Sequence, residues 1–131
     1  VETLDEAPVL LAVSQSAPSD RIERLRDAGV EVLVVGSGES NVDLKQLLAE
    51  LARRSMTNVL IEGGGQLLGA AFDHSLVDEV HVFVAPKFAG GADAVTPVAG
   101  VGAETIPEIS QLATQTVERV GDDVYIHGRL H

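Results

Sequence analysis

The chain has no cysteine among its 131 residues. This absence excludes disulfide bonds, a thiol nucleophile and cysteine metal ligands. It also fits a reducing compartment, so we expect a cytoplasmic protein.

Basic residues are scarce, with 9 Lys and Arg against 20 Asp and Glu and a net charge of −11. Proteins that bind nucleic acids usually carry a basic surface, so we expect no nucleic-acid partner. An anionic small molecule remains compatible, because local hydrogen-bond donors and a helix dipole can outweigh a screened net charge.

Long apolar runs are also missing: no stretch approaches the roughly 20 residues of a membrane span, and no signal peptide is visible. We therefore expect no membrane partner. The length and the hydrophobic content of 45% suit a single domain over residues 1–131. The first residue is Val1 instead of methionine, and we expect a piece cut from a longer protein.

The first 75 residues alternate between apolar runs and amphipathic stretches. They predict strands over 8–14, 30–35 and 58–61, and helices over 20–28, 43–54 and 65–74. Ser19 or Asp20 is expected to cap the first helix. Asn41 or Asp43 is expected to cap the second. Such alternation favours strand–helix–strand crossovers and a parallel sheet.

The pattern changes after residue 78. Glu79–Pro86 reads as a strand, and residues 87–107 form a loop rich in Gly, Pro and Ala. Gln115–Val120 and Val124–Leu130 then read as a hairpin. The predicted fold class is α/β, a mostly parallel sheet flanked by helices with an antiparallel C-terminal hairpin.

Three glycines follow Glu62 and open directly into the predicted helix over 65–74. Free N–H groups and a partial positive charge at a helix N-terminus favour an anion such as phosphate. The alternative is a tight strand-to-helix turn that needs glycine for its backbone. Leu68 stands where a dinucleotide fingerprint needs glycine, and the P-loop lysine is also absent. The pattern predicts an anion site without naming the anion.

Glu62 has two interpretations. In the structural interpretation, its carboxylate accepts hydrogen bonds from N–H groups of the following turn or is simply solvated. In the functional interpretation, it binds the amide and amino edge of a ligand such as a pyrimidine. Gly36–Ser40 is a second glycine loop, for which a plain flexible connection is favoured. The spacing of the four histidines, His74, His81, His127 and His131, predicts surface or structural roles and no metal site.

Five short motifs carry a resemblance to a known family. They are Thr57–Gly65, Leu68–Ala70, Leu76–Val80, Val84–Lys87 and Gly90–Gly91. In order and spacing they resemble the C-terminal reductase domain of the bifunctional riboflavin-biosynthesis deaminase/reductase. The likeness spans most of the chain.

This resemblance implies a dihydrofolate-reductase-like fold, a homodimer and a substrate-binding role for Glu62. It implies NADPH-dependent reduction of 5-amino-6-(5-phosphoribosylamino)uracil to the ribitylamino product. The implied cofactor-binding residues are Gly64, Gly65, Gln66, Leu67, Leu68, Gly69 and Ala70. The family usually has a small hydroxyl residue where this chain has Gln66. The first strands of the family's reductase domain are not matched in this chain. We therefore expect the chain to supply mainly the cofactor-binding part of such a domain.

Two alternatives stay open. One is a reductase of the same fold acting on folate or a related pteridine, since Glu62 does not separate pyrimidine from pteridine edges. The other is a non-catalytic nucleotide-binding or assembly module. No catalytic acid is assigned. Candidate cations for a cofactor 2′-phosphate are Lys45, Arg53, Arg54 and Lys87.

Overall fold

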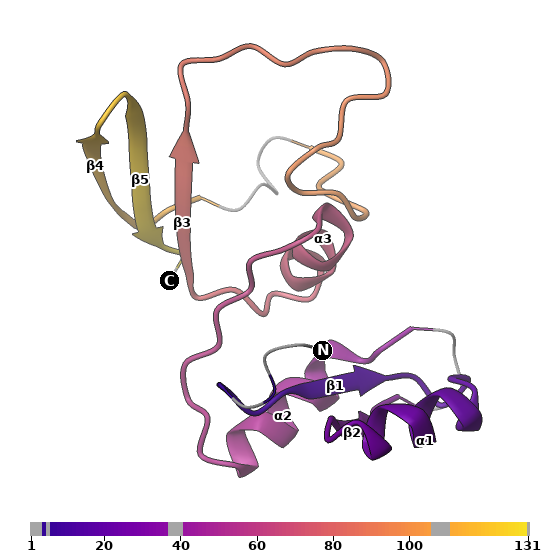
Figure 1. Ribbon diagram of the computed structural model, residues 1–131. Coiled ribbons are helices and arrows are strands. Elements are labelled where there is room, and N and C mark those ends of the chain that lie inside the picture. Colours follow the sequence, from indigo (N-terminus) through magenta and orange to yellow (C-terminus); the bar gives the residue numbers. More distant parts are fainter. Residues whose placement is uncertain (1–3, 5, 37–40, 106–110, 131) are drawn as a thin grey trace. The chain divides into compact units, whose positions relative to one another are not determined.

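The computed structural model describes residues 4, 6–36, 41–105 and 111–130. The chain divides into two compact units, Val1–Val59 and Leu60–His131 (Figure 1). Among the described residues, the first unit has two helices and the second has one, and each unit has its own sheet. That residues 1–131 form one domain stays a prediction.

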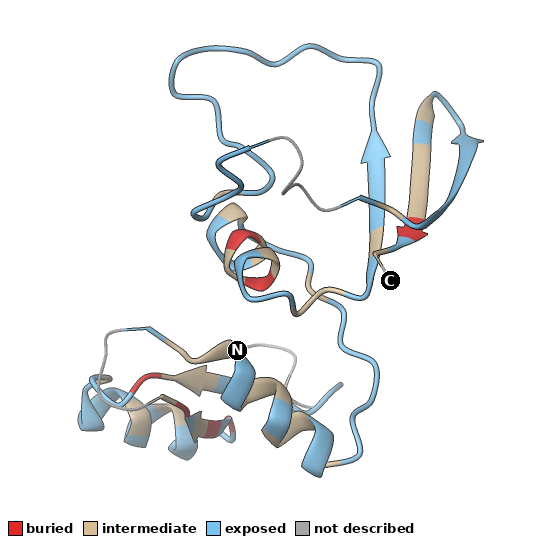
Figure 2. Cartoon of the chain, turned by 180° about the vertical axis from the view of Figure 1, so that it is seen from behind, coloured by how far each residue is buried: buried red, intermediate tan, exposed pale blue. Residues whose placement is uncertain are grey.

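The first unit is built on two parallel strands, as the alternating pattern predicts. Strands β1 (Leu10–Val13) and β2 (Glu31–Val34) pair in parallel. Helix α1 (Ser19–Asp27) connects them, and helix α2 (Leu44–Arg53) follows. The buried apolar side chains of this unit lie on and beside β2, and Figure 2 colours buried residues red. They are Val30, Val32 and Val35.

The two helix starts of this unit differ in how they are capped. Pro18 precedes α1 without a side-chain cap, so the prediction that Ser19 or Asp20 caps this helix is wrong. Proline suits a helix start because its ring fixes φ near the helical value and its missing N–H is not needed there. Asp43 does cap α2, and its carboxylate accepts a hydrogen bond from the Gln46 nitrogen at 3.1 Å.

The second unit begins with helix α3 (Gly65–Asp73) and continues into an antiparallel sheet. Strand β3 (Glu79–Val84) is followed by β4 (Thr114–Val120) and β5 (Asp123–Arg129), in the order β3-β5-β4. The C-terminal hairpin is thus confirmed, and residues 85–105 form neither helix nor strand. The chain is an α/β protein, with a parallel pair and an antiparallel sheet among its described residues.

The segment over 58–61 is not the buried strand that its apolar run predicts. Val59 is 44% exposed and Leu60 is 73% exposed. The boundary between the two units falls between these two residues. An apolar run becomes a strand only beside another strand that satisfies its backbone groups, and no described strand pairs with this one.

Candidate functional site

The site begins with the glycine turn before α3. Gly64 precedes the helix with φ 40° and ψ 145°, a conformation that residues with a Cβ rarely adopt. The Leu68 nitrogen donates to the Gly64 carbonyl at 3.1 Å and closes the first turn. No side chain among the described residues caps this helix. Its first N–H groups are therefore available to an anion.

A pocket of about 360 Å³ opens at this helix start. Its two walls come from different parts of the second unit. The lining residues are Glu62, Gly63, Gly64, Gly65 and Leu68 on one side, and Val95, Thr96 and Pro97 on the other. Sequence reasoning missed the second wall, because the loop over 87–107 has no periodicity or motif that singles out these three residues.

Glu62 is exposed at the edge of this pocket. Within the described residues its carboxylate makes no hydrogen bond and no ion pair, so the bond to the following turn, which was one of the two interpretations, is not found there. A carboxylate in this position is free to accept hydrogen bonds from the N–H groups of a ligand.

The seven residues predicted to bind the cofactor divide into two groups. Gly64, Gly65 and Leu68 line the pocket. Gln66, Leu67, Gly69 and Ala70 are not among the described residues that line it. Gln66 and Leu67 are exposed, whereas Gly69 is buried. A cofactor contact for any of the seven stays a prediction.

Gly65 and Gly69 allow the segment over 96–100 to approach α3 closely. A Cβ on Gly65 would lie 2.6 Å from the Thr96 carbonyl oxygen, and one on Gly69 would overlap the carbonyl of Ala99. The Ala99 nitrogen donates to the Gly65 carbonyl at 2.9 Å. The close approach of this backbone segment to α3 therefore explains why both positions require glycine.

Asp73, at the last position of α3, holds the same segment. Its Oδ2 accepts from the Val101 nitrogen at 2.7 Å, and its Oδ1 accepts from the Gly102 nitrogen at 3.0 Å. These two hydrogen bonds favour the charged carboxylate and lower the pKa of Asp73. The segment over 96–102 is thus attached at both ends of the helix.

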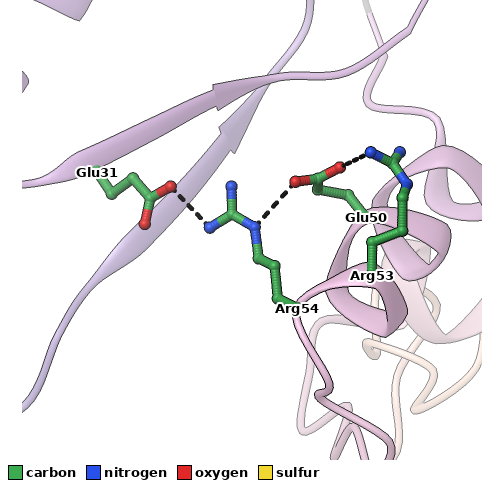
Figure 3. Close-up of polar contacts among 4 residues, drawn as sticks. All are labelled: Glu31, Glu50, Arg53 and Arg54. Atoms are coloured by element: carbon green, nitrogen blue, oxygen red, sulfur yellow. Dashed lines mark hydrogen bonds and ion pairs between the residues drawn. The ribbon is translucent and has the colours of Figure 1, made fainter.

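The two arginines proposed for a 2′-phosphate are engaged elsewhere. Arg54 donates from Nε to Glu50 at 2.9 Å and pairs with Glu31 at 2.6 Å, while Arg53 pairs with Glu50 (Figure 3). The hydrogen bond from Arg54 lowers the pKa of Glu50, and the hydrogen bonds to Glu50 and Glu31 raise the pKa of Arg54. This network ties the end of α2 to the start of β2.

Histidines form a ring cluster on the second sheet. His81 Nδ1 lies 2.6 Å from the Tyr125 hydroxyl, and its Nε2 lies 3.3 Å from Glu79. His127 stacks on both His81 and Tyr125. No group of three or more potential metal ligands occurs in the part of the chain that the structure describes.

Some predicted features lie outside the described residues. They are His131 and residues 37–40 of the second glycine loop. No helix within the described ranges is long and apolar enough to cross a membrane.

Known proteins similar to this chain point to one family. Residues 1–126 match the family model of the RibD C-terminal domain. The riboflavin biosynthesis protein RibD of Actinobacillus pleuropneumoniae is 34% identical, over 96% of this chain and 33% of that protein. The 2,5-diamino-6-ribosylamino-4(3H)-pyrimidinone 5′-phosphate reductase of Methanothermobacter thermautotrophicus is 37% identical, over 93% of this chain and 55% of that protein.

A solved structure agrees on the fold. RibD of Acinetobacter baumannii superposes with a TM-score of 0.71 at 24% identity, over 90% of this chain and 30% of that one. The chain spans only a third to about half of the length of these curated relatives. The family match covers nearly all of the chain itself, and the resemblance seen in its motifs is confirmed. The chain belongs to the RibD C-terminal domain family.

Proposed function

We propose that this chain supplies the cofactor-binding part of an NADPH-dependent reductase of riboflavin biosynthesis. Its substrate would be the phosphorylated ribosylamino-pyrimidine 5-amino-6-(5-phosphoribosylamino)uracil, reduced to the ribitylamino product. Support comes from relatives named as reductases of a closely similar phosphate ester. One observation carries the proposal: the uncapped start of α3 opens into a pocket that Glu62 borders.

The residues divide the work between two ligands. In this proposal the free N–H groups of α3 and the bare backbone of Gly64 and Gly65 hold cofactor phosphate oxygens. Glu62 accepts hydrogen bonds from the N–H groups of the pyrimidine. When bound, the nicotinamide supplies the hydride that reaches the ribose C1. The chain's part is to hold both partners in reactive geometry.

A preference for NADPH over NADH requires a cation near the 2′-phosphate. Arg53 and Arg54 already pair with carboxylates of the first unit. Lys87 is the candidate that lies in the same unit as the pocket, and we propose it for this contact. A cytoplasmic location and a homodimer complete the proposal.

The test is turnover by the full-length protein, followed by the loss of nicotinamide absorbance. We expect NADPH to be consumed with the phosphorylated ribosylamino-pyrimidine and not with a dihydropteridine. Turnover of the dihydropteridine alone would favour a folate or pteridine reductase. NADPH binding without any turnover would favour a non-catalytic nucleotide-binding module.

Glu62→Gln tests the assigned role of this carboxylate. The glutamine keeps the size of the side chain and removes its charge. The KM for the pyrimidine should rise about tenfold, which corresponds to about 1.4 kcal/mol, while the KM for NADPH stays unchanged. Glu118→Gln, at an exposed position on β4, is the matched control and should change neither value.

A further inference from the structure

Asp73 makes a two-point attachment between α3 and the loop that follows β3. Each carboxylate oxygen accepts one backbone N–H, from Val101 at 2.7 Å and from Gly102 at 3.0 Å. Neither of these donors lies in a helix or a strand. Hydrogen bonds from N–H groups to a charged carboxylate are stronger than neutral ones. This attachment is therefore a defined anchor for a loop that has no regular structure.

The anchored segment continues directly into the pocket wall. Between the two, the Ala99 nitrogen donates to the Gly65 carbonyl at 2.9 Å, and the backbone of Ala99 and Gly100 lies against Gly69. Thr96 Oγ1 donates to the Val98 carbonyl at 2.8 Å and holds the bend at the C-terminal end of the wall. In Figure 1 the orange segment lies over α3. The chain from Val95 to Gly102 thus follows the whole length of the helix.

We propose that Asp73 is a positioning residue for the cofactor pocket. By holding Val101 and Gly102, it keeps the wall of Val95, Thr96 and Pro97 opposite the glycine turn. This inference rests on the proposed function, because it assigns to Asp73 the preorganisation of the same cofactor site. It adds a residue that is not among the described residues lining the pocket and that no motif of the chain marks.

The anchor at Asp73 restricts the conformational freedom of the segment that it holds. The segment contains Gly100 and Gly102, which are among the least restricted residues when they are not held. Without the anchor, the wall would sample many conformations, and ordering it would cost free energy at the moment of binding. The two hydrogen bonds also lower the pKa of Asp73, so the carboxylate is charged at neutral pH.

The experiment compares four single variants and the double variant Asp73→Ala/Gly100→Ala in NADPH titrations and site-resolved amide exchange. Asp73→Ala removes both acceptors, and Asp73→Asn keeps one of them. Gly100→Ala acts from the loop side, because its Cβ would overlap Asp73 Oδ2 and lie 3.1 Å from Gly69 Cα. Asp93→Ala removes an equal charge from the same loop, where its side chain has no hydrogen bond to the described residues.

The expected results form a pattern. Asp73→Ala should raise the Kd for NADPH about tenfold and Asp73→Asn should raise it less, since about 1.4 kcal/mol corresponds to each factor of ten. The Val101 and Gly102 amides should exchange faster in Asp73→Ala, while the amides of β5 stay unchanged. Gly100→Ala should also raise the Kd for NADPH. The Kd of the double variant should not exceed the larger of the two single-variant Kd values, because both changes remove the same anchor. Asp93→Ala should change nothing.

Two outcomes would overturn the inference. One is an unchanged Kd in Asp73→Ala although the unmodified chain binds NADPH. The other is unchanged exchange at Val101 and Gly102, which would show that Asp73 does not hold the segment. If the unmodified chain binds no NADPH, the proposed function fails, and the exchange data still decide whether Asp73 is the anchor.

Discussion

The backbones of Gly69 and Ala99 are in direct contact. A Cβ on Gly69 would overlap the carbonyl of Ala99 and lie 2.7 Å from the Gly100 nitrogen. The neighbouring atoms belong to backbone, so no side-chain rotation relieves such an overlap. α3 and the segment over 96–100 therefore depend on the absence of a side chain at position 69.

Gly69→Ala should destabilise the second unit. Overpacking costs about 1–3 kcal/mol, which exceeds the gain of up to about 1 kcal/mol from replacing glycine inside a helix. Urea denaturation measures the net change. Gln66→Ala, exposed on the same helix, is the control and should be neutral or slightly stabilising. Equal stability of the two variants would show that the contact is not tight.

Gly64→Ala and Gly63→Ala form a matched pair in the glycine turn. Neither added Cβ would meet an atom within 4 Å, and only Gly64 has a φ in the left-handed range. Alanine at position 64 should therefore cost about 1–3 kcal/mol through backbone strain alone. Alanine at position 63 should cost much less. Equal denaturation midpoints for the two variants would mean that the turn does not require glycine at position 64.

Asp43→Ala should destabilise the first unit by about 1 kcal/mol, the usual cost of losing an N-cap. Asp43 accepts from the backbone nitrogen of Gln46 and from its side-chain Nε2 at 3.0 Å. Asn41→Ala is the control, because Asn41 is the other residue that the sequence offers as a cap and it does not cap the helix. Chemical denaturation of both variants checks the prediction. A larger effect at Asn41 would contradict it.

Glu50 should make the stability of the first unit depend on pH. Its pKa is lower when folded, chiefly because Arg54 donates a hydrogen bond to it. Its contribution is therefore present above the ordinary glutamate pKa of about 4.3 and is lost as the pH falls through the lower folded value. The stability difference between the unmodified chain and Glu50→Gln should close over that acid range.

A control separates this effect from general acid denaturation. Glu23→Gln changes an exposed glutamate on α1, and its stability should follow that of the unmodified chain at every pH. Added salt should reduce the effect of Glu50→Gln at neutral pH, because exposed ion pairs are screened. An effect of Glu50→Gln that persists unchanged into strong acid would contradict the assigned ion pairs.

The sequence predicts well those elements that local patterns specify. The stripe of Leu44, Leu47, Leu48 and Leu51 predicts α2, and all four are half-buried. Gly121, with φ 62°, allows the short turn of the predicted C-terminal hairpin. Asp43 is one of the two caps that the pattern offers. In these cases, residues close in sequence determine the outcome.

Features that depend on distant residues were missed or misjudged. Val59 and Leu60 look like a buried strand, but burial needs a partner strand that local sequence does not reveal. Val95, Thr96 and Pro97 reach the pocket only because the loop folds back along α3. The family motif implies a cofactor contact for Gly69, which stays a prediction, but it does not reveal that the Ala99 backbone packs against this residue.

We propose that the start of α3 binds cofactor phosphate, and NADPH titration of Gly63→Asp against Gly63→Asn decides this. Position 63 lines the pocket and has open space around it, so both side chains are accommodated. The aspartate adds a negative charge beside the proposed phosphate, and the asparagine matches its shape. We expect a Kd raised by about tenfold or more for the aspartate, at about 1.4 kcal/mol per factor of ten, and little change for the asparagine. Equal NADPH affinities for the two variants would contradict the claim.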